Sequence, residues 1–337
     1  MQIQKNYNLS KLNTFGINAI TKFFVEVKSE ADLVELFVLP VFKENKKMFL
    51  GGGSNVLFTK DFDGIIVLNK LKGMEIVENN LDTVLIRSMG GEPWHDFVLF
   101  AVGNGYWGIE NLTLIPGTVG ATPIQNIGAY GMELKDALSD VEAFEIETGK
   151  KKIFSKEECE LGYRESIFKN KLKGKYFISA ITLKLNKTEK KNIGYKALKE
   201  YLEKNKIEIK NSQDVSDAVA CIRRSKLPDP KILGNAGSFF KNIFVKKEQL
   251  DKLKEKYPDI SYFEENSVIK IPAGWLIEQC GWKGKRMGNV GVYEKQALVL
   301  VNYGGATGGE VLTLANKIIA SVKEKFGLKI TLEVDLI

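Results

Sequence analysis

The stretch Leu50–Phe58 reads LGGGSNVLF, with three consecutive glycines between two apolar segments. The residues before and after the glycines, Met48–Leu50 and Val56–Phe58, have the composition of short strands. A hairpin turn needs two or three turn residues, not three glycines in a row. Glycine-rich loops approach phosphates closely because their backbone N–H groups are bare. We therefore interpret Gly51, Gly52, Gly53, Ser54 and Asn55 as a candidate phosphate-binding loop, with a simple turn as the alternative.

A second glycine-rich segment, Leu112–Gly131, reads LTLIPGTVGATPIQNIGAYG. It is too long for a simple turn and too apolar for a flexible linker. A segment of this length inside a domain is usually ordered and functional. We expect it to be ordered, and we expect it to be able to enclose a pyrophosphate together with the first loop.

Two other glycine clusters fit phosphate-binding patterns only in part. Residues 103–108 (GNGYWG) match the letters GxGxxG, but they follow a predicted helix instead of a strand. Residues 304–309 (GGATGG) precede a helix, but Ala306 stands where the second glycine is needed, and Thr307 to Glu310 form a capping box. We interpret both clusters as helix boundaries. Without a complete Rossmann or Walker motif, a dinucleotide enzyme would need another fold.

The hydrophobic pattern predicts short strands interspersed with helices, and 337 residues predict two or three subdomains. The expected strands are 23–27, 65–68, 83–88, 141–147, 176–185 and 297–301, with a closing strand at 328–337. The expected helices are 30–37, one starting at Pro93, 215–226, and a long one from Thr307 that stops at Gly327. In the closing strand, Glu333 falls on the polar face.

The net charge is +7, which fits either a lysine-rich surface or a field that attracts an anionic small substrate. Nucleic-acid binding is less favoured, because no basic helix with interleaved aromatic residues occurs. The three cysteines are scattered without a CxxC, which is typical of a reduced compartment. No membrane span or signal-peptide core stands out, so we expect a cytoplasmic protein. With His95 as the single histidine, no metal site is expected.

Eight motifs occur in a characteristic order along the chain. They are NTFG (13–16), LGGGSNVLF (50–58), IPGTVGATPIQNIGAYG (115–131), GYRESIFK (162–169), KLPDPK (226–231), GNAGSFFKN (234–242), AGWLIEQCGWKG (273–284) and LEVDLI (332–337). Together they resemble the UDP-N-acetylenolpyruvoylglucosamine reductase (MurB) family, from Asn13 to the last residue. The region around Tyr195 resembles the tyrosine-bearing loop of the type I branch.

The resemblance implies an α+β fold with a vanillyl-alcohol-oxidase-type (PCMH-type) FAD-binding part of two subdomains and a C-terminal α+β substrate-binding subdomain. The implied boundaries are 1–72 with 327–337, then 73–214, then 215–326, with the flavin-binding region at about 17–187. It also implies the reaction: NADPH reduces FAD, and the reduced flavin reduces an enolpyruvyl ether of a UDP-sugar to a lactyl ether. His95 has no counterpart in the family, so we expect noncovalent FAD. We expect a monomer with no nucleic-acid or membrane partner.

The resemblance assigns three catalytic residues. Ser238 would donate a proton to the substrate carbon, so no histidine is required; the alternative is a turn serine bonded to backbone. Arg164 would stabilise the developing negative charge, because a guanidinium suits a carboxylate or an enolate; the alternative is a surface arginine paired with Glu165. Glu333 would be the catalytic glutamate; the alternative is a solvent-exposed side chain.

The resemblance also assigns the ligand contacts. The substrate diphosphate and sugar would be bound by Tyr195, Lys226, Asn242, Lys283 and Gln296. The flavin would be bound by Gly51, Gly52, Gly53, Ser54, Asn55, Pro116, Gly117, Gly120, Thr122, Ile127 and Gly128, mostly through backbone groups.

Three other functions compete with this assignment. A flavin oxidase of the same fold would have no reason to keep Ser238 and Arg164 in these motifs. A serine hydrolase using Ser238 and His95 would lack the GxSxG elbow and would be colourless. An inactive UDP-sugar binder would not need the set of Arg164, Ser238 and Glu333.

Overall fold

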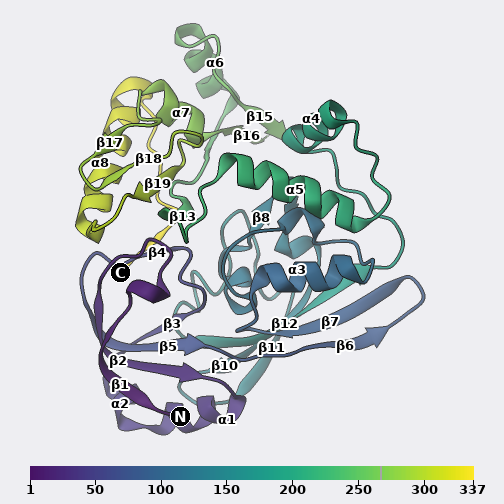
Figure 1. Cartoon of the computed structure of the whole chain (residues 1–337), viewed down its shortest axis with the longest axis vertical. Coiled ribbons are helices and arrows are strands. Elements are labelled where there is room, and N and C mark those ends of the chain that lie inside the picture. Colours follow the sequence, from purple (N-terminus) through teal and green to yellow (C-terminus); the bar gives the residue numbers. More distant parts are fainter. Residues whose placement is uncertain (266–267) are drawn as a thin grey trace. The chain divides into compact units, whose positions relative to one another are not determined.

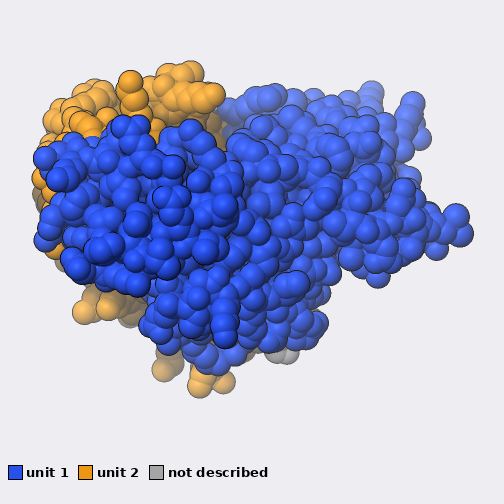
Figure 2. Space-filling model, turned by 90° about the horizontal axis from the view of Figure 1, so that it is seen from below, with its two compact units in different colours: residues 1–7, 21–53, 63–225 blue, residues 8–20, 54–62, 226–337 orange. Residues whose placement is uncertain are grey.

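The computed structural model describes residues 1–265 and 268–337, and these divide into two compact units. The first unit comprises residues 1–7, 21–53 and 63–225, and the second comprises 8–20, 54–62 and 226–337 (Figure 2). Each unit is therefore assembled from three separate stretches of chain. Within the described residues, the helices are all too short or too polar to cross a membrane.

A four-stranded sheet in the first unit has the order β1-β2-β5-β3, and β3 runs parallel to β5 (Figure 1). Two short helices, α1 and α2, pack on it through Leu33, Phe37 and Phe42 against Val25 and Val67. The elements are β1 (Ile3–Asn8), β2 (Ile20–Val27), α1 (Glu30–Val38), α2 (Pro40–Glu44), β3 (Lys46–Leu50) and β5 (Phe62–Asn69).

A five-stranded sheet in the same unit has the order β11-β10-β12-β7-β6 and is antiparallel throughout. Helix α3 packs Trp94, Phe97 and Val98 into the core of this sheet, with Ile86 and Val141. The strands are β6 (Met74–Asn79), β7 (Thr83–Met89), β10 (Leu138–Glu145), β11 (Lys151–Ser155) and β12 (Tyr176–Asn186), and α3 is Trp94–Gly103.

The rest of the first unit is short elements and two further helices. Helices α4 (Lys196–Asn205) and α5 (Ser212–Lys226) share a core around Trp107, Leu198 and Val219. The short elements are the 3-10 turns η2 (Glu110–Leu112), η3 (Val119–Gln125) and η4 (Leu134–Asp136) and the strand pair β8 (Gly128–Ala129) and β9 (Met132–Glu133).

The second unit contains a four-stranded sheet of order β13-β19-β18-β17 and a three-stranded sheet of order β14-β16-β15 (Figure 1). Its strands are β13 (Gly234–Ser238), β14 (Ile243–Val245), β15 (Phe263–Glu265), β16 (Val268–Ile271), β17 (Arg286–Met287), β18 (Val290–Val292) and β19 (Val299–Asn302). Its helices are η1 (Ser10–Leu12), α6 (Lys247–Lys256), α7 (Ala273–Gln279) and α8 (Gly308–Phe326). A short parallel pair joins β4 (Val56–Leu57) to β20 (Asp335–Leu336).

The predicted boundaries of the long C-terminal helix are confirmed. Thr307 and Glu310 form the capping box, and Gly327 ends α8 in the left-handed conformation with φ of +68°. Gly308 has a further reason to be glycine, because an added Cβ would lie 1.9 Å from the Phe58 carbonyl oxygen. Helix α5 begins at Ser212, before the predicted Val215, because Asn211 and Asp214 each accept the other's backbone N–H.

The predicted closing strand at 328–337 is wrong over most of its length. Only Asp335–Leu336 forms a strand, and Leu332 makes an isolated bridge to Phe240. The alternating pattern also breaks, since Glu333 is 8% exposed whereas Leu336 is 43% exposed. Leu332 pairs with Phe240, whereas Asp335–Leu336 pairs with β4. Because the segment does not follow one sheet along its length, its side chains do not alternate between a buried and an exposed face.

An ion-pair network crosses the five-stranded sheet. Arg87 on β7 donates to Glu142 on β10 through Nε and, at 2.9 Å, through Nη2. Lys151 on β11 donates to the same carboxylate at 3.1 Å, and Arg87 also donates to Glu75 at 3.0 Å. Glu142 is buried. The hydrogen bond from Arg87 is the largest cause of a lowered pKa at the Glu142 carboxyl.

We expect Glu142→Gln to lower the free energy of unfolding at pH 7 by about 3 kcal/mol, because it leaves Arg87 partly buried without its main counter-charge. The folded-state pKa is depressed, so this stabilisation is present above the unfolded carboxyl pKa of about 4.3 and is lost as the pH falls below it. Urea unfolding at pH 7 and near pH 3.5 measures both values. Glu203→Gln, which removes an exposed pair with Lys199, is the matched control and should change stability by less than about 0.5 kcal/mol. A difference that persists unchanged at low pH would contradict the ionic origin.

Candidate active site

The two predicted flavin loops lie against each other within the first unit. A Cβ added at Gly51 would lie 2.3 Å from Thr118 Oγ1, and one added at Gly52 would lie 2.7 Å from the Gly117 Cα. A Cβ added at Gly120 would lie 3.0 Å from the Gly90 Cα. The glycines are therefore required by the close approach of two backbones, which is the kind of contact a phosphate-binding cradle needs.

The segment 112–131 is ordered, as predicted. Backbone hydrogen bonds tie it to the start of α3: Trp94 N donates to Gly117 O at 3.0 Å, and Val119 N donates to Glu92 O at 2.8 Å. Leu114, Asn126 and Tyr130 adopt left-handed backbone conformations with φ of +57°, +43° and +50°. Such non-glycine conformations cost free energy and cluster at functional sites.

Five buried polar groups in this unit have no hydrogen-bond partner among the described residues, and two of them, Thr118 Oγ1 and Arg223 Nε, lie on the second flavin loop and on α5. Arg223 on α5 donates one hydrogen bond, from Nη2 to Leu114 O at 3.2 Å, and its burial lowers its pKa. A cation held in this way calls for an anionic or carbonyl ligand. Sequence reasoning missed Arg223. Val215, Val219 and Arg223 follow one another at intervals of four residues, so Arg223 lies on the apolar face of the helix. A cation on an apolar face is the sequence feature that could have identified it.

Arg164 lies on a tight turn in which Gly162 and Glu165 pair their backbones. Its own φ is +55°. The guanidinium donates to two carbonyls of the second flavin loop, Gly128 O at 3.0 Å and Asn126 O at 3.4 Å. The turn thus directs this arginine onto the segment that the sequence predicts to bind flavin.

Ser238 ends β13 in the second unit and is half-buried. The residue before it, Gly237, has φ of +67°, and the pairing of β13 with β19 shifts register between Asn235 and Ser238. Asn235 stabilises this bulge, because its Oδ1 accepts the Gly237 N–H at 2.9 Å. Bulges re-aim side chains and are common next to active sites.

Glu333 is brought next to this serine. Its backbone N–H donates to Phe239 O at 2.9 Å, and Phe239 directly follows Ser238. Its side chain is buried, so the alternative of a solvent-exposed glutamate is wrong. Asn55 Nδ2 donates to the Glu333 carbonyl at 3.2 Å, which gives this predicted flavin residue a contact with the segment that carries Glu333.

The predicted substrate residues of the second unit include two that flank the start of α7. Asn242 Oδ1 accepts the N–H of Ala273, the first residue of α7, at 3.1 Å. Gln296 Oε1 lies 3.2 Å from a Cβ added at Gly274. Lys283, beyond the end of α7, pairs with Glu278 at 2.8 Å, and Lys226 is the last residue of α5.

The predicted site residues therefore fall into two sets, one in each unit. The first unit holds Arg164, Tyr195, Gly51, Gly52, Gly53 and the flavin-loop residues between Pro116 and Gly128; the second holds Ser54, Asn55, Lys226, Ser238, Asn242, Lys283, Gln296 and Glu333. His95 is half-buried on α3, as predicted, and its Nδ1 accepts the Leu114 N–H at 3.3 Å.

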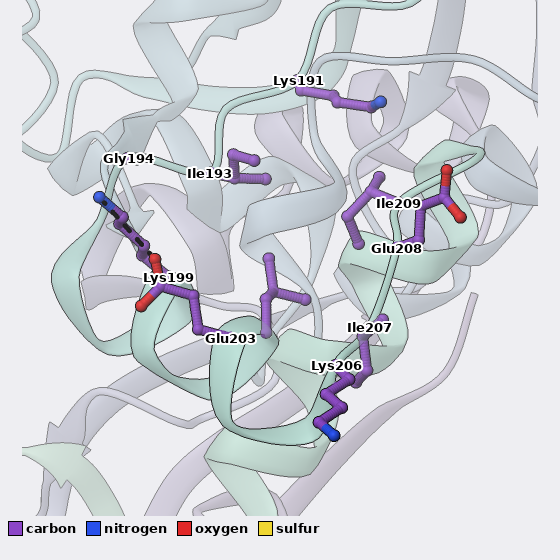
Figure 3. Close-up of a pocket in the computed structure, with 10 residues that line it drawn as sticks. Lys191, Ile193, Gly194, Lys199, Glu203, Lys206, Ile207, Glu208 and Ile209 are labelled. Atoms are coloured by element: carbon purple, nitrogen blue, oxygen red, sulfur yellow. Dashed lines mark ion pairs between the residues drawn. The ribbon is translucent and has the colours of Figure 1, made fainter.

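A pocket of about 590 Å³ lies beside α4 (Figure 3). It is lined by Lys191, Ile193, Gly194, Lys199, Leu202, Glu203 and residues 206–209. Lys199 and Glu203 form an ion pair at 3.9 Å in its wall. Its lining includes none of the residues that the sequence assigns to flavin or substrate.

Comparison with known proteins supports the fold. An FAD-binding domain model matches residues 21–152, and the C-terminal domain model of UDP-N-acetylenolpyruvoylglucosamine reductase matches residues 229–337. The crystal structure of the MurB reductase from Thermus caldophilus superposes with a TM-score of 0.67 at 22% identity, over 100% of this chain and 99% of that one. The predicted combination of an FAD-binding part with a C-terminal subdomain is confirmed.

Full-length relatives carry the same name. The reductase of Flavobacterium johnsoniae is 49% identical over 100% of both chains, and that of Bdellovibrio bacteriovorus is 44% identical over 99% of both. The reductase of Porphyromonas gingivalis is 46% identical, also over 100% of both chains. At this identity over the whole length, the chain belongs to the UDP-N-acetylenolpyruvoylglucosamine reductase family.

Proposed function

We infer that this chain is an FAD-dependent oxidoreductase that reduces UDP-N-acetylglucosamine enolpyruvate to UDP-N-acetylmuramate in peptidoglycan precursor synthesis. The observation that carries this conclusion is the full-length similarity to reductases of this name, together with the matching FAD-binding domain. NADPH is the electron donor of the family's reaction. When bound, FAD supplies the hydride carrier between NADPH and the enolpyruvyl group.

The residues of the first unit fit a bound FAD. The close backbones of Gly51, Gly52 and Gly117 would cradle its pyrophosphate. Thr118 Oγ1 and Arg223 Nε, which are buried without a hydrogen-bond partner, would form hydrogen bonds with polar atoms of the cofactor. Thr122 has a structural task as well, because its hydroxyl donates to Val119 O at 2.7 Å and its carbonyl accepts the Ile127 N–H. We keep Gly53, Ser54, Asn55, Pro116, Gly120, Ile127 and Gly128 as further proposed flavin contacts.

Arg164, Ser238 and Glu333 would have separate roles in the reduction of the substrate. Hydride addition to the terminal vinyl carbon builds negative charge on the adjacent carbon and its carboxylate. Arg164 would stabilise that charge, and Ser238 would give a proton to the carbon. A hydroxyl is a weak acid, so a cation beside the serine is needed. Glu333, held at the residue after Ser238, would orient the donor and the substrate.

The remaining assignments belong to the same proposal. Tyr195, Lys226, Asn242, Lys283 and Gln296 would bind the diphosphate and sugar. The division into subdomains at 1–72 with 327–337, 73–214 and 215–326 would place four of these residues in the last subdomain and Tyr195 in the second. We propose a cytoplasmic monomer, which size-exclusion chromatography with light scattering tests.

An anaerobic visible titration tests the function. Purified protein with FAD should lose its flavin absorbance on addition of NADPH and regain it on addition of UDP-N-acetylglucosamine enolpyruvate. Bleaching without recovery would retain the flavoprotein and overturn the substrate. A protein that stays colourless after added FAD would overturn the whole proposal and would favour the hydrolase alternative.

Arg223→Met is expected to weaken FAD binding by about tenfold to a hundredfold, because a hydrogen bond to a charged group is lost. The same change should leave the melting temperature of the FAD-free protein equal or higher, because it removes a buried cation. Flavin fluorescence quenching gives the dissociation constant, and calorimetry gives the melting temperature. Arg224→Met changes the exposed neighbour on the same helix and should alter neither value. Unchanged FAD affinity in Arg223→Met would contradict the assignment.

A further inference from the structure

Two asparagines fasten the segment that carries Tyr195, residues 187–195 between β12 and α4, to the loop 126–131. Asn111 Nδ2 donates to Asn192 O at 2.7 Å and to Tyr130 O at 2.9 Å. Asn192 Nδ2 donates to Gly131 O at 3.0 Å. Three hydrogen bonds from two side chains thus join three stretches of chain that are distant in sequence.

The placement of Asn111 is costly, which argues that these bonds matter. The residue is 0% exposed, and both of its donor hydrogens are used. Its Oδ1 is buried without a hydrogen-bond partner in the part of the chain that the structure describes. A buried acceptor without a hydrogen-bond partner destabilises the folded chain. An amide kept at that cost is retained for its two donor contacts.

The consequence falls on Tyr195. Its ring packs edge-on against the Tyr130 ring, with centroids 5.5 Å apart and planes at 74°. A Cβ added at Gly131 would lie 3.6 Å from the Tyr195 Cβ and also 3.6 Å from Asn192 Oδ1. The backbone at Tyr130 and Gly131 therefore sets where the Tyr195 side chain begins.

The same loop holds Arg164. The carbonyls of Asn126 and Gly128 accept from its guanidinium, whereas those of Tyr130 and Gly131 accept from the two asparagines. The loop 126–131, with left-handed backbone at Asn126 and Tyr130, therefore contacts both the Arg164 side chain and the segment that carries Tyr195.

On its other side the segment borders a hollow. Lys191, Ile193 and Gly194 line the pocket beside α4 (Figure 3). Ile193 also packs against the core of α4 and α5. The asparagine hydrogen bonds are therefore among the contacts that fix this segment, together with the packing of Ile193.

We propose that Asn111 and Asn192 are positioning residues that hold Tyr195 at a fixed place relative to Arg164 for binding of the UDP-sugar diphosphate. The inference rests on the proposed role of Tyr195. It identifies Asn192 as a determinant of substrate affinity that does not itself touch the substrate.

Substrate binding to the oxidised holoenzyme tests this without turnover. UDP-N-acetylglucosamine enolpyruvate is titrated in the absence of NADPH, and the change in the flavin spectrum gives the dissociation constant. Asn192→Ala should raise that constant by about three- to tenfold, the effect of one lost hydrogen bond. Asn192→Asp should raise it at least as much, because its carboxylate faces the Gly131 carbonyl. FAD content and the rate of flavin reduction by NADPH should not change.

A double-mutant cycle separates positioning from general destabilisation. If Asn192 acts through Tyr195, then Asn192→Ala combined with Tyr195→Ala should bind no more weakly than Tyr195→Ala alone. Asn205→Ala removes an exposed side-chain hydrogen bond on α4, from Asn205 Nδ2 to the Tyr201 carbonyl. It serves as the control and should leave the affinity unchanged. Wild-type affinity in Tyr195→Ala would overturn the role of Tyr195 and this inference with it. Weak binding in Tyr195→Ala with normal binding in Asn192→Ala, or additive effects, would overturn the inference alone.

Discussion

Ser238→Ala is expected to lower the rate at which the enolpyruvyl substrate reoxidises the reduced flavin by about 10²- to 10⁴-fold, the usual contribution of a positioned proton donor. Reduction of the flavin by NADPH should keep its normal rate, because that step needs no proton at the substrate carbon. The physical reason lies in the bulge before Ser238, which fixes this side chain on the edge of β13 beside the segment of Glu333.

Stopped-flow absorbance under anaerobic conditions measures the two half-reactions separately. Ser238→Cys should recover part of the second rate, because a thiol can also give up a proton. Ser225→Ala, which removes a serine hydroxyl bonded to its own helix, is the matched control. A Ser238→Ala enzyme that reoxidises at the normal rate would remove Ser238 from the chemistry and leave it as a structural residue of the β13 bulge.

The comparison of sequence with structure shows what local patterns can predict. The ends of α8 depend on residues within the helix and just beside it, so Thr307, Glu310 and Gly327 could be assigned directly. The start of α3 beside Pro93 follows from local sequence in the same way. Ser238 ends the strand β13 at a bulge and does not lie in the turn that its neighbouring glycine suggests, and its proposed role comes from the family resemblance.

The rest depends on contacts between distant segments, which periodicity does not encode. Glu333 was placed on a polar face because the alternation of residues 328–337 was assumed to continue. Its burial instead follows from pairing with Phe239, almost a hundred residues earlier. Arg223 could not be singled out because an arginine near a helix end is usually solvated; here its Nη2 donates to the Leu114 carbonyl. The asparagine hydrogen bonds that join the segment 187–195 to the loop 126–131 likewise connect residues that no motif links.

The glycine loop gives the second large expected effect. Gly52→Ala should reduce the FAD content of the purified protein to less than about a tenth, because its Cβ would lie 2.7 Å from the Gly117 Cα and must push the two loops apart. Overpacking between backbones typically costs about 1–3 kcal/mol, and a displaced cradle loses its hydrogen bonds to the phosphates as well. The ratio of flavin absorbance to protein absorbance measures the FAD content directly.

Gly103→Ala is the matched control, since the space around Gly103 is open within 4 Å and the residue lies at the end of α3. It should keep full FAD content and, by restricting the unfolded chain, should not lower stability. Circular dichroism of Gly52→Ala should match that of the wild-type protein without FAD, which separates loss of the cofactor from loss of the fold. If Gly52→Ala retains FAD at full occupancy, the loop 51–53 is a structural turn, and the pyrophosphate must be bound by the segment 116–128 without it.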